Sequence, residues 1–390
     1  MISIPDDSKT APSTRRIELP AVNLARYAAA VFLVLFHFLP LQEIQDGAVR
    51  NLFSKGYLGT SFFFLLSGFL LTHVYASRLR SAGDVPAFQV KRFARLYPPY
   101  LLGLLIALPI ALFNKNALPL LEQAGSIIAY LLSLQAWIPD WALKINGPGW
   151  SVSALMFFYL VFPFALRAFR RFQKYLPFFL LFLWVIYLVP PSLYQLLLPD
   201  GQAVTVFSGL TWLNVLKFNP LIRLPEFLLG MGGAALFEER RFASVLQRPW
   251  ALPGLLLATI LIAAGIPAET PLYPLLHNGL FTPLLLLIVL ALAYDQSVVS
   301  RAGQSPLGRR LADSSLQIFL LHVPLFVYLF NAAKLVGWMG EKPSVPFVLL
   351  ALVVVLAVAY FVDQKLMRPL SGRLVRKWQE RQQATTIKTA

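Results

Sequence analysis

Ten apolar segments follow one another along this chain, and each is about as long as a membrane-crossing helix. About 20 helical residues cross the hydrocarbon core of a bilayer. Backbone polar groups must be satisfied internally in lipid, so such segments fold as helices. The sequence therefore predicts an all-α fold, a polytopic membrane helix bundle with ten transmembrane helices. The expected spans are residues 22–40, 57–77, 96–113, 149–167, 176–194, 221–237, 251–267, 275–294, 315–335 and 346–363.

Composition agrees with this class. Of 390 residues, 57% are hydrophobic and only 13% are charged, with a mean hydropathy of +0.65. Soluble domains carry roughly twice that charged fraction. The net charge of +16 raises the possibility of a nucleic-acid partner. The basic residues, however, lie in short loops between apolar spans, which is the distribution of the positive-inside rule. We therefore expect membrane lipid, and no nucleic acid, as a partner.

The basic loops predict the orientation of the spans. Two clusters, one before the third span and one after the fourth, are expected on the cytoplasmic side. Both termini are then cytoplasmic, and the stretch between about 114 and 148 begins and ends outside. Its apolar part, near 124–137, is too short to cross a membrane, so we expect a re-entrant or interfacial segment there. The clusters are Arg78, Arg80, Lys91, Arg92 and Arg95, and Arg167, Arg170, Arg171 and Lys174.

Few features outside the spans suggest further modules. We expect a cytoplasmic tail at 1–20, one membrane domain at 21–368 and a basic cytoplasmic tail at 369–390. The polar N-terminal residues do not resemble a cleaved signal peptide. The chain has no cysteine, and its four histidines lack the spacing of metal ligands. No metal site and no permanently bound cofactor are expected.

Two costly polar residues lie in the first span, Arg26 and His37. An eleven-residue offset turns an α-helix through about three turns plus roughly 20° and rises about 16 Å. The two side chains therefore share one helical face, with Arg26 nearer the cytoplasm and His37 nearer the outer leaflet. Each alone has a structural explanation, as an interfacial cation and a hydrogen-bonded interior histidine. Together they indicate a functional site that extends along this face of the helix through the membrane.

Other polar residues in the spans were placed by depth. Arg223 and Glu226, at positions i and i+3, are expected in the outer half at the level of His37, as an ion pair that orients the site or is structural. Trp150 and Ser151 are expected at the same outer level, although a tryptophan there is also typical of an interfacial belt.

Three further candidates line the predicted channel. Ser67 and His322 are expected near mid-membrane, and Tyr159 lies in the fourth span. Ser67 with Gly68 also suits close helix packing, and His322 also suits an interhelical hydrogen bond.

The segment KRFARLYPPY, at the start of the third span, carries Lys91, Arg92, Arg95 and Tyr97. These cations fit either a positive-inside cluster or a phosphate site close to a helix N-terminus. A phosphorylated cytoplasmic molecule such as a coenzyme A thioester suits the second interpretation.

Taken in order, six stretches make the chain resemble the acyltransferase-3 family of integral membrane acyltransferases, from about residue 18 to 370. They are the Arg26 to His37 spacing, GYLGTSFFFLLSGFLLT, KRFARLYPPY, NGPGWSVSALMFFYLVFP, RLPEFLLGM and SSLQIFLLHVPLF. These motifs are most similar to those of the branch of the family that modifies exopolysaccharides and other surface sugars.

The resemblance implies a membrane O-acyltransferase of the bacterial inner (cytoplasmic) membrane. It would move an acyl group, most often acetyl, from cytoplasmic acyl-CoA, a co-substrate, to a hydroxyl of an extracytoplasmic or lipid-linked glycan such as exopolysaccharide or lipopolysaccharide. The family requires the Arg and His of the first span and uses the arginines of the KRFAR-like motif for the donor. On this chain these are Arg26, His37, Arg92 and Arg95.

Two positions depart from the family's pattern. Leu155 stands where the family usually has Glu, five residues after Trp150, and Ser61 stands where Asp is common. Leu155 raises the alternative of a catalytically inactive member that acts as a scaffold in glycan assembly.

The resemblance and the chemistry together suggest roles. His37 is the expected general base that deprotonates the acceptor hydroxyl, or a nucleophile in a two-step relay. Arg26 would hold the donor, while Glu226 and Arg223 would orient His37 or the acceptor. A transporter or exporter of a lipid-linked sugar or small molecule is the alternative from another class, although no internal repeat typical of transporters is evident.

Overall fold

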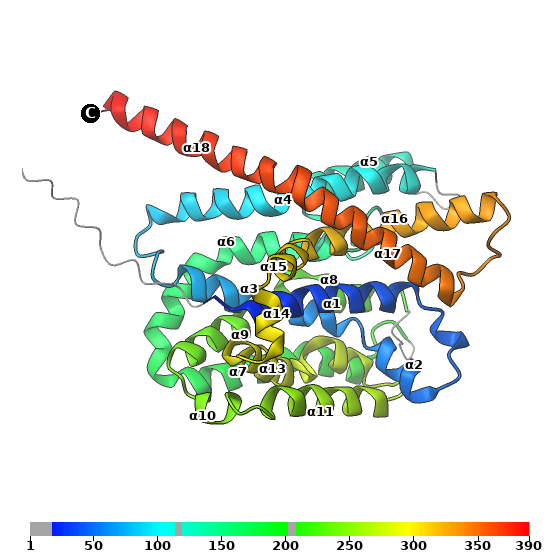
Figure 1. Cartoon of the computed structure of the whole chain (residues 1–390), viewed down its shortest axis with the longest axis horizontal. Helices are drawn as coiled ribbons and strands as arrows, with labels where there is room; N and C mark the ends of the chain where they lie inside the picture. The colour runs from blue at the N-terminus through cyan, green and yellow to red at the C-terminus, as the bar shows by residue number, and fades with distance from the viewer. Residues whose placement is uncertain (1–17, 114–118, 202–207, 390) are drawn as a thin grey trace, which may run out of the picture.

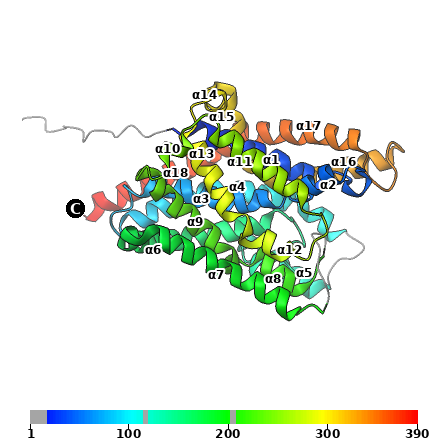
Figure 2. The same ribbon diagram turned by 90° about the horizontal axis from the view of Figure 1, so that it is seen from below.

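The structure is a computed structural model that describes residues 18–113, 119–201 and 208–389. Within these ranges the chain forms helices and no strands, and the long helices run roughly side by side (Figures 1 and 2). The predicted all-α bundle is confirmed. All ten expected spans are helical, and their ends lie within a few residues of expectation except that α4 begins at Asp84, α6 ends at Phe172 and α13 begins at Thr282. The spanning helices are α1 (Pro20–Phe38), α3 (Leu58–Tyr75), α4 (Asp84–Leu112), α6 (Gly149–Phe172), α7 (Leu176–Leu197), α9 (Pro220–Glu238), α11 (Ala251–Gly265), α13 (Thr282–Tyr294), α16 (Ser315–Leu335) and α17 (Val345–Val362).

By length and composition, eight helical segments of the described chain are able to cross a membrane. One of them, Gly149–Leu197, contains both α6 and α7. The ring centroids of Phe169 and Phe179 lie 5.2 Å apart, whereas ten residues of straight helix rise about 15 Å. The chain therefore reverses at the short turn Gln173–Tyr175, and α6 and α7 are separate spans. Helix α11 is shorter, with 15 residues, and completes the ten.

Short helices connect the spans. They are α2 (Gly47–Ser54), α5 (Leu120–Leu131), α8 (Thr211–Phe218), α10 (Ala243–Leu246), α12 (Tyr273–Leu275), α14 (Val298–Gln304) and α15 (Pro306–Asp313), with single turns at Leu41–Glu43 and Gln135–Trp137. A π-helical turn, Leu276–Leu280, joins α12 to α13 and is broken at Asn278 and Gly279, where φ of Gly279 is 109°.

The segment between α4 and α6 runs from the end of α4 back into the bundle. The hydroxyl of Tyr100 donates to the Tyr130 carbonyl at 2.6 Å, and that of Tyr97 donates to the Leu131 carbonyl at 2.8 Å. Tyr100 lies twelve residues before the end of α4 at Leu112, which is about 18 Å along a helix. Helix α5 therefore descends to mid-bundle, as a re-entrant segment does, and this agrees with the expectation for 124–137.

Helices α3 and α9 make the closest approach in the bundle. A Cβ at Gly68 would lie 1.9 Å from the Phe227 carbonyl oxygen, and a Cβ at Gly230 would lie 1.9 Å from the Leu65 carbonyl oxygen. Only glycine permits this backbone contact. The packing interpretation of Gly68 is thus confirmed, and the large apolar core forms around α3, α6, α9 and α13.

Two helices extend beyond the expected spans. Helix α4 begins at Asp84 rather than near residue 96, because the basic KRFAR segment continues the helix instead of preceding it. After α17, the π-helical turn Asp363–Met367 leads without a break into α18 (Arg368–Thr389), which projects from the bundle (Figure 1). The expected basic tail is therefore helical over its described length.

Candidate functional site

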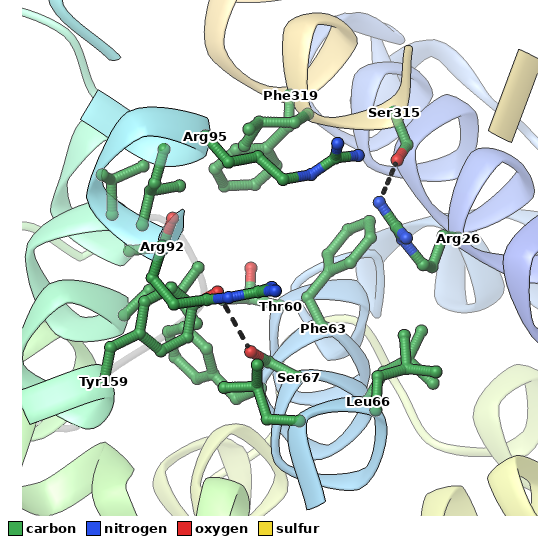
Figure 3. Close-up of a pocket in the computed structure, with 18 residues that line it drawn as sticks. Arg26, Thr60, Phe63, Leu66, Ser67, Arg92, Arg95, Tyr159, Ser315 and Phe319 are labelled. Atoms are coloured by element: carbon green, nitrogen blue, oxygen red, sulfur yellow. Dashed lines mark hydrogen bonds between the residues drawn. The ribbon is translucent and has the colours of Figure 1, made fainter. Parts of the chain in front are cut away.

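A cavity lies among α1, α3, α4, α6 and α16 and contains three arginines (Figure 3). It extends along α3 from Thr60 to Leu71, which is eleven residues or about 16 Å of helix. Most of its wall is apolar. The lining residues are Arg26, Thr60, Phe63, Phe64, Leu66, Ser67, Leu70, Leu71, Arg92, Arg95, Leu96, Ser151, Val152, Leu155, Tyr159, Ser315, Leu316 and Phe319.

The arginines reach the cavity from two helices. Arg26 projects from α1 and donates to the Ser315 hydroxyl, the first residue of α16, at 3.2 Å. Arg92 and Arg95 project from α4, three residues apart, and their guanidinium groups point into the same space as that of Arg26 (Figure 3). Three like charges around one mostly apolar space form a site for an anion, since a guanidinium presents forked donors to phosphate or carboxylate oxygens.

Different partners hold the two arginines of α4. Arg92 donates to the Tyr75 hydroxyl at 2.7 Å and lies 4.9 Å from the centre of that ring. Arg95 lies 3.8 Å from the Asp313 carboxylate, and its side chain is 51% exposed. The cavity is therefore accessible from the surface at its Arg95 end.

Hydroxyl groups and aliphatic side chains line the middle of the cavity. The Ser67 and Tyr159 hydroxyls share a hydrogen bond of 3.3 Å (Figure 3). Ser151 lies nearby at the start of α6, and Leu155 lines the wall one turn further along. The residue that departs most from the family's pattern is thus part of the cavity wall.

A histidine pair lies beyond the end of this cavity that is opposite Arg95. Nε2 of His322 is 2.9 Å from Nδ1 of His37, and the ring planes differ by 26°. His322 is completely buried, whereas His37 is exposed. Phe36, next to His37, packs against Gly56 at the turn before α3, so the pair lies at the end of the bundle opposite Arg95.

An aromatic ring contacts both the cavity and the histidine pair. Phe63 and Phe319 both line the cavity, with ring centroids 5.8 Å apart. The Phe319 ring lies 6.2 Å from that of His322, three residues further along α16. The arginine cavity and the histidine pair are therefore neighbours, and Phe319 contacts both.

Helix α16 contacts both polar residues of α1. Arg26 binds Ser315 and His37 binds His322, and the seven-residue offset from Ser315 to His322 returns to nearly the same face of α16. The shared face expected for Arg26 and His37 is thus the face against α16. The interhelical hydrogen bond that was one explanation of His322 is present, and its partner is His37.

The expected contact of Arg223 and Glu226 with His37 is absent from the described residues. They form a completely buried ion pair of 2.9 Å. Arg223 also donates to the His277 carbonyl at 2.7 Å and the Asn278 side-chain oxygen at 2.9 Å. The break in the π-helical turn frees this carbonyl, and Arg223 satisfies it. His37 has His322 as its partner instead.

Other expectations also need correction. Arg92 and Arg95 line the cavity, but Lys91 and Tyr97 do not, and the Tyr97 hydroxyl supports the re-entrant segment. The cluster lies two turns inside α4, so a helix N-terminus adds nothing to anion binding there. Trp150 and Ser151 are not level with His37, because Trp150 contacts Phe64 inside α3, whereas Phe36, next to His37, packs against Gly56 before α3 begins. Trp150 packs on Phe64 and Phe218, so it is no interfacial belt residue.

Several site residues were not foreseen, namely Tyr75, Ser315, Thr60, Phe63 and Phe319. Of these, Ser315 had a usable signal, because it precedes His322 by seven residues in SSLQIFLLH and so shares its helical face. The aromatic residues carry no such signal among the many phenylalanines of the spans.

The described chain is thus a multi-span helical bundle that holds an arginine-lined cavity and, next to it, a histidine pair. The model of the acyltransferase-3 family, described as an acyltransferase domain, matches residues 19–363. The chain belongs to this family, and it is a multi-pass membrane protein of the acyltransferase class. The chain is 27% identical over 334 residues to acyltransferase MdmB of Streptomyces mycarofaciens, covering 80% of each chain. It is 34% identical over 118 residues to protein 2 in the picA locus of Rhizobium radiobacter, covering 25% of this chain and 60% of that protein. No solved structure matches the chain.

Proposed function

We propose that this acyltransferase moves an acyl group from cytoplasmic acyl-CoA to a hydroxyl of an extracytoplasmic or lipid-linked glycan. The observation that carries the proposal is the cavity with Arg26, Arg92 and Arg95, whose outer end approaches the pair of His37 and His322. A phosphorylated, largely extended donor suits a narrow cavity with cations at one end and apolar walls beyond them.

The donor's phosphates would bind the arginines, with Arg95 at the exposed mouth and Arg26 deeper inside. The pantetheine arm would then extend along α3 past Ser67 toward Phe319. The cavity extends about 16 Å along this helix. This arrangement would bring the thioester close to the histidine pair without a covalent relay on the protein.

The transfer step uses His37 as general base. The glycan hydroxyl attacks the thioester carbonyl carbon and its proton passes to Nε2 of His37. The tetrahedral intermediate then expels the coenzyme A thiolate, and the proton on His37 passes to that sulfur. The C–S bond is replaced by a C–O bond, and His37 is regenerated neutral.

The test is labelled acetyl transfer from acetyl-CoA to total cell glycan in a strain that lacks this protein. Complementation with the wild type should restore transfer, and His37→Ala should not, although it accumulates in the membrane. His73→Ala is the matched control, because His73 lies at the other end of α3 beside Glu238. Full transfer by His37→Ala would remove His37 from the mechanism, and no transfer by the wild type would favour the scaffold alternative.

A further inference from the structure

The hydrogen bonds of the buried His322 ring determine which of its nitrogens carries a proton. Nδ1 of His322 lies 2.8 Å from the Phe319 carbonyl oxygen and 3.2 Å from the Ile318 carbonyl oxygen. A carbonyl oxygen only accepts hydrogen bonds, so Nδ1 must be the donor in both contacts. In a neutral imidazole the other nitrogen, Nε2, then carries a lone pair.

A doubly protonated His322 does not fit its surroundings. The ring is completely buried, and its described neighbours are His37, Phe38 and Phe319 with the two carbonyl groups. A charge buried without an ionic partner costs several kcal/mol. The neutral ring with a lone pair on Nε2 is therefore the stable form.

This lone pair in turn determines the proton position on His37. Nδ1 of His37 lies 2.9 Å from Nε2 of His322, and two lone pairs at that distance would repel each other. Nδ1 of His37 must therefore donate. A neutral His37 then has its own lone pair on Nε2, on the far side of a ring whose side chain is exposed.

We propose that His322 is the positioning residue of His37: it accepts the Nδ1 proton of His37, and so holds the neutral ring in the one tautomer whose Nε2 can take a proton. This inference rests on the proposed function, because it deepens the role of His37 there. His322 itself touches neither donor nor acceptor. Nδ1 of His322 donates to backbone carbonyls of α16, and Nε2 of His322 accepts from Nδ1 of His37. The α16 backbone thus fixes the His322 ring, and the His322 ring fixes that of His37.

A hydrogen bond that only stabilised the fold would not need to fix the tautomer of His37. An imidazole without such a partner divides between its two tautomers and rotates about its side-chain bonds. A general base contributes roughly 10²–10⁴-fold to a reaction when it is correctly protonated and placed. Loss of the His322 acceptor should therefore lower kcat by roughly 10–100-fold, within that contribution, and leave the KM for acyl-CoA unchanged, because His322 does not line the arginine cavity.

Two amide substitutions make a matched pair for the test. The side-chain oxygen in His322→Gln reaches about as far as Nε2 and remains an acceptor for His37, whereas the shorter amide in His322→Asn reaches only the Phe319 carbonyl. Both variants keep a polar amide of the same chemistry in the pocket. We expect His322→Gln to retain most of the wild-type kcat and His322→Asn to lose it, each at an unchanged KM for acetyl-CoA.

A second measurement does not depend on activity or on a tolerated substitution. The chain has four histidines, so solid-state NMR of the ¹⁵N-histidine-labelled wild type in lipid can resolve each ring. We expect His37 and His322 to be neutral, with protonated Nδ1 and unprotonated Nε2 in both. A proton on Nε2 of His37, or a wild-type kcat in His322→Asn, would overturn the inference. If either of these results is found but His37→Ala is inactive, the inference about His322 fails and the proposed function stands. If His37→Ala is fully active, the proposed function itself fails.

Discussion

The guanidinium of Arg92 donates a 2.7 Å hydrogen bond to the hydroxyl of Tyr75 and lies over its ring, at 4.9 Å from the ring centre. Tyr75 is the last residue of α3 and is buried against Phe88 of α4. The contact therefore fixes a long, flexible cation at the wall of the cavity. An arginine held in advance loses less conformational entropy when an anion binds to it.

We predict that Arg92→Ala weakens binding of a non-hydrolysable acyl-CoA analogue by at least tenfold, since a hydrogen bond to a charged group contributes roughly 1.5–3 kcal/mol. Tyr75→Phe removes the positioning bond but keeps the charge, so it should weaken binding by a smaller factor. Calorimetry on the purified protein in detergent measures both.

Arg78→Ala is the control for this measurement. Arg78 is an exposed arginine just after α3 and does not line the cavity. Its loss changes the net charge by the same amount as the loss of Arg92. Equal affinities of Arg92→Ala and Arg78→Ala would make the KRFAR segment a topology signal and remove it from the donor site.

Much of the fold was predictable because the membrane reduces the problem to apolar length and loop charge. Spans such as 315–335 were predicted to the residue for that reason. The depth of a residue in the bundle was less predictable. Counting residues along a span gives the depth only if that span starts at the membrane surface. Helix α6 begins inside the bundle, so Trp150 and Ser151 were placed too far out.

Pairing between helices was the least predictable part of the site. His37 and Arg26 could be placed on one face from their spacing alone. Which helix covers that face depends on the packing of all ten spans, so the sequence did not pair His37 with His322. The same limit applies to Arg223. Its ion pair with Glu226 could be predicted because the two residues are three positions apart on one helix, but its contact with the broken turn at Asn278 could not.

The crossing of α3 and α9 should tolerate no side chain. Gly68→Ala and Gly230→Ala each place a Cβ 1.9 Å from a backbone carbonyl oxygen of the other helix. Overpacking typically costs 1–3 kcal/mol, and a backbone neighbour cannot move aside as a side chain can. We predict a clearly lower thermal unfolding midpoint for both variants in detergent.

Gly254→Ala is the matched control for these variants. Gly254 lies in α11 and has nothing within 4 Å of an added Cβ. Alanine is favoured over glycine inside a helix by up to about 1 kcal/mol, so this variant should keep or raise the midpoint. Midpoints at the wild-type value for Gly68→Ala and Gly230→Ala would mean that α3 and α9 do not approach as closely as described.

Lys55 should make the stability of the outer end depend on pH. The residue is only 2% exposed, and its ammonium group donates to the Ile266 and Pro267 carbonyls at 3.1 and 3.0 Å and to the Ser54 hydroxyl at 3.0 Å. Burial lowers the pKa of Lys55 from 10.5 to about 8. Between these values the unfolded chain binds the proton and the folded chain does not, so stability rises with pH.

From pH 7.5 to 9.5 the free energy of unfolding should therefore rise by roughly 2 kcal/mol on account of Lys55. Lys55→Met has no such group and should show a smaller rise. The measurement compares thermal midpoints of both proteins in one detergent at the two pH values. Parallel pH dependences would show that the Lys55 ammonium is not desolvated in the folded protein.

Glu226 should stabilise the fold without taking part in catalysis. Its carboxylate is the countercharge of Arg223 at 2.9 Å, and both side chains are completely buried. Removing one partner of a buried ion pair typically costs 3–5 kcal/mol, because the other charge remains buried. We predict that Glu226→Gln lowers the thermal midpoint strongly, and that replacing both residues by methionine lowers it less than the single change.

The folded fraction of Glu226→Gln should transfer acyl groups at the wild-type kcat, since His37 pairs with His322 and not with Glu226. A lost kcat at an unchanged midpoint would instead return Glu226 to the catalytic machinery.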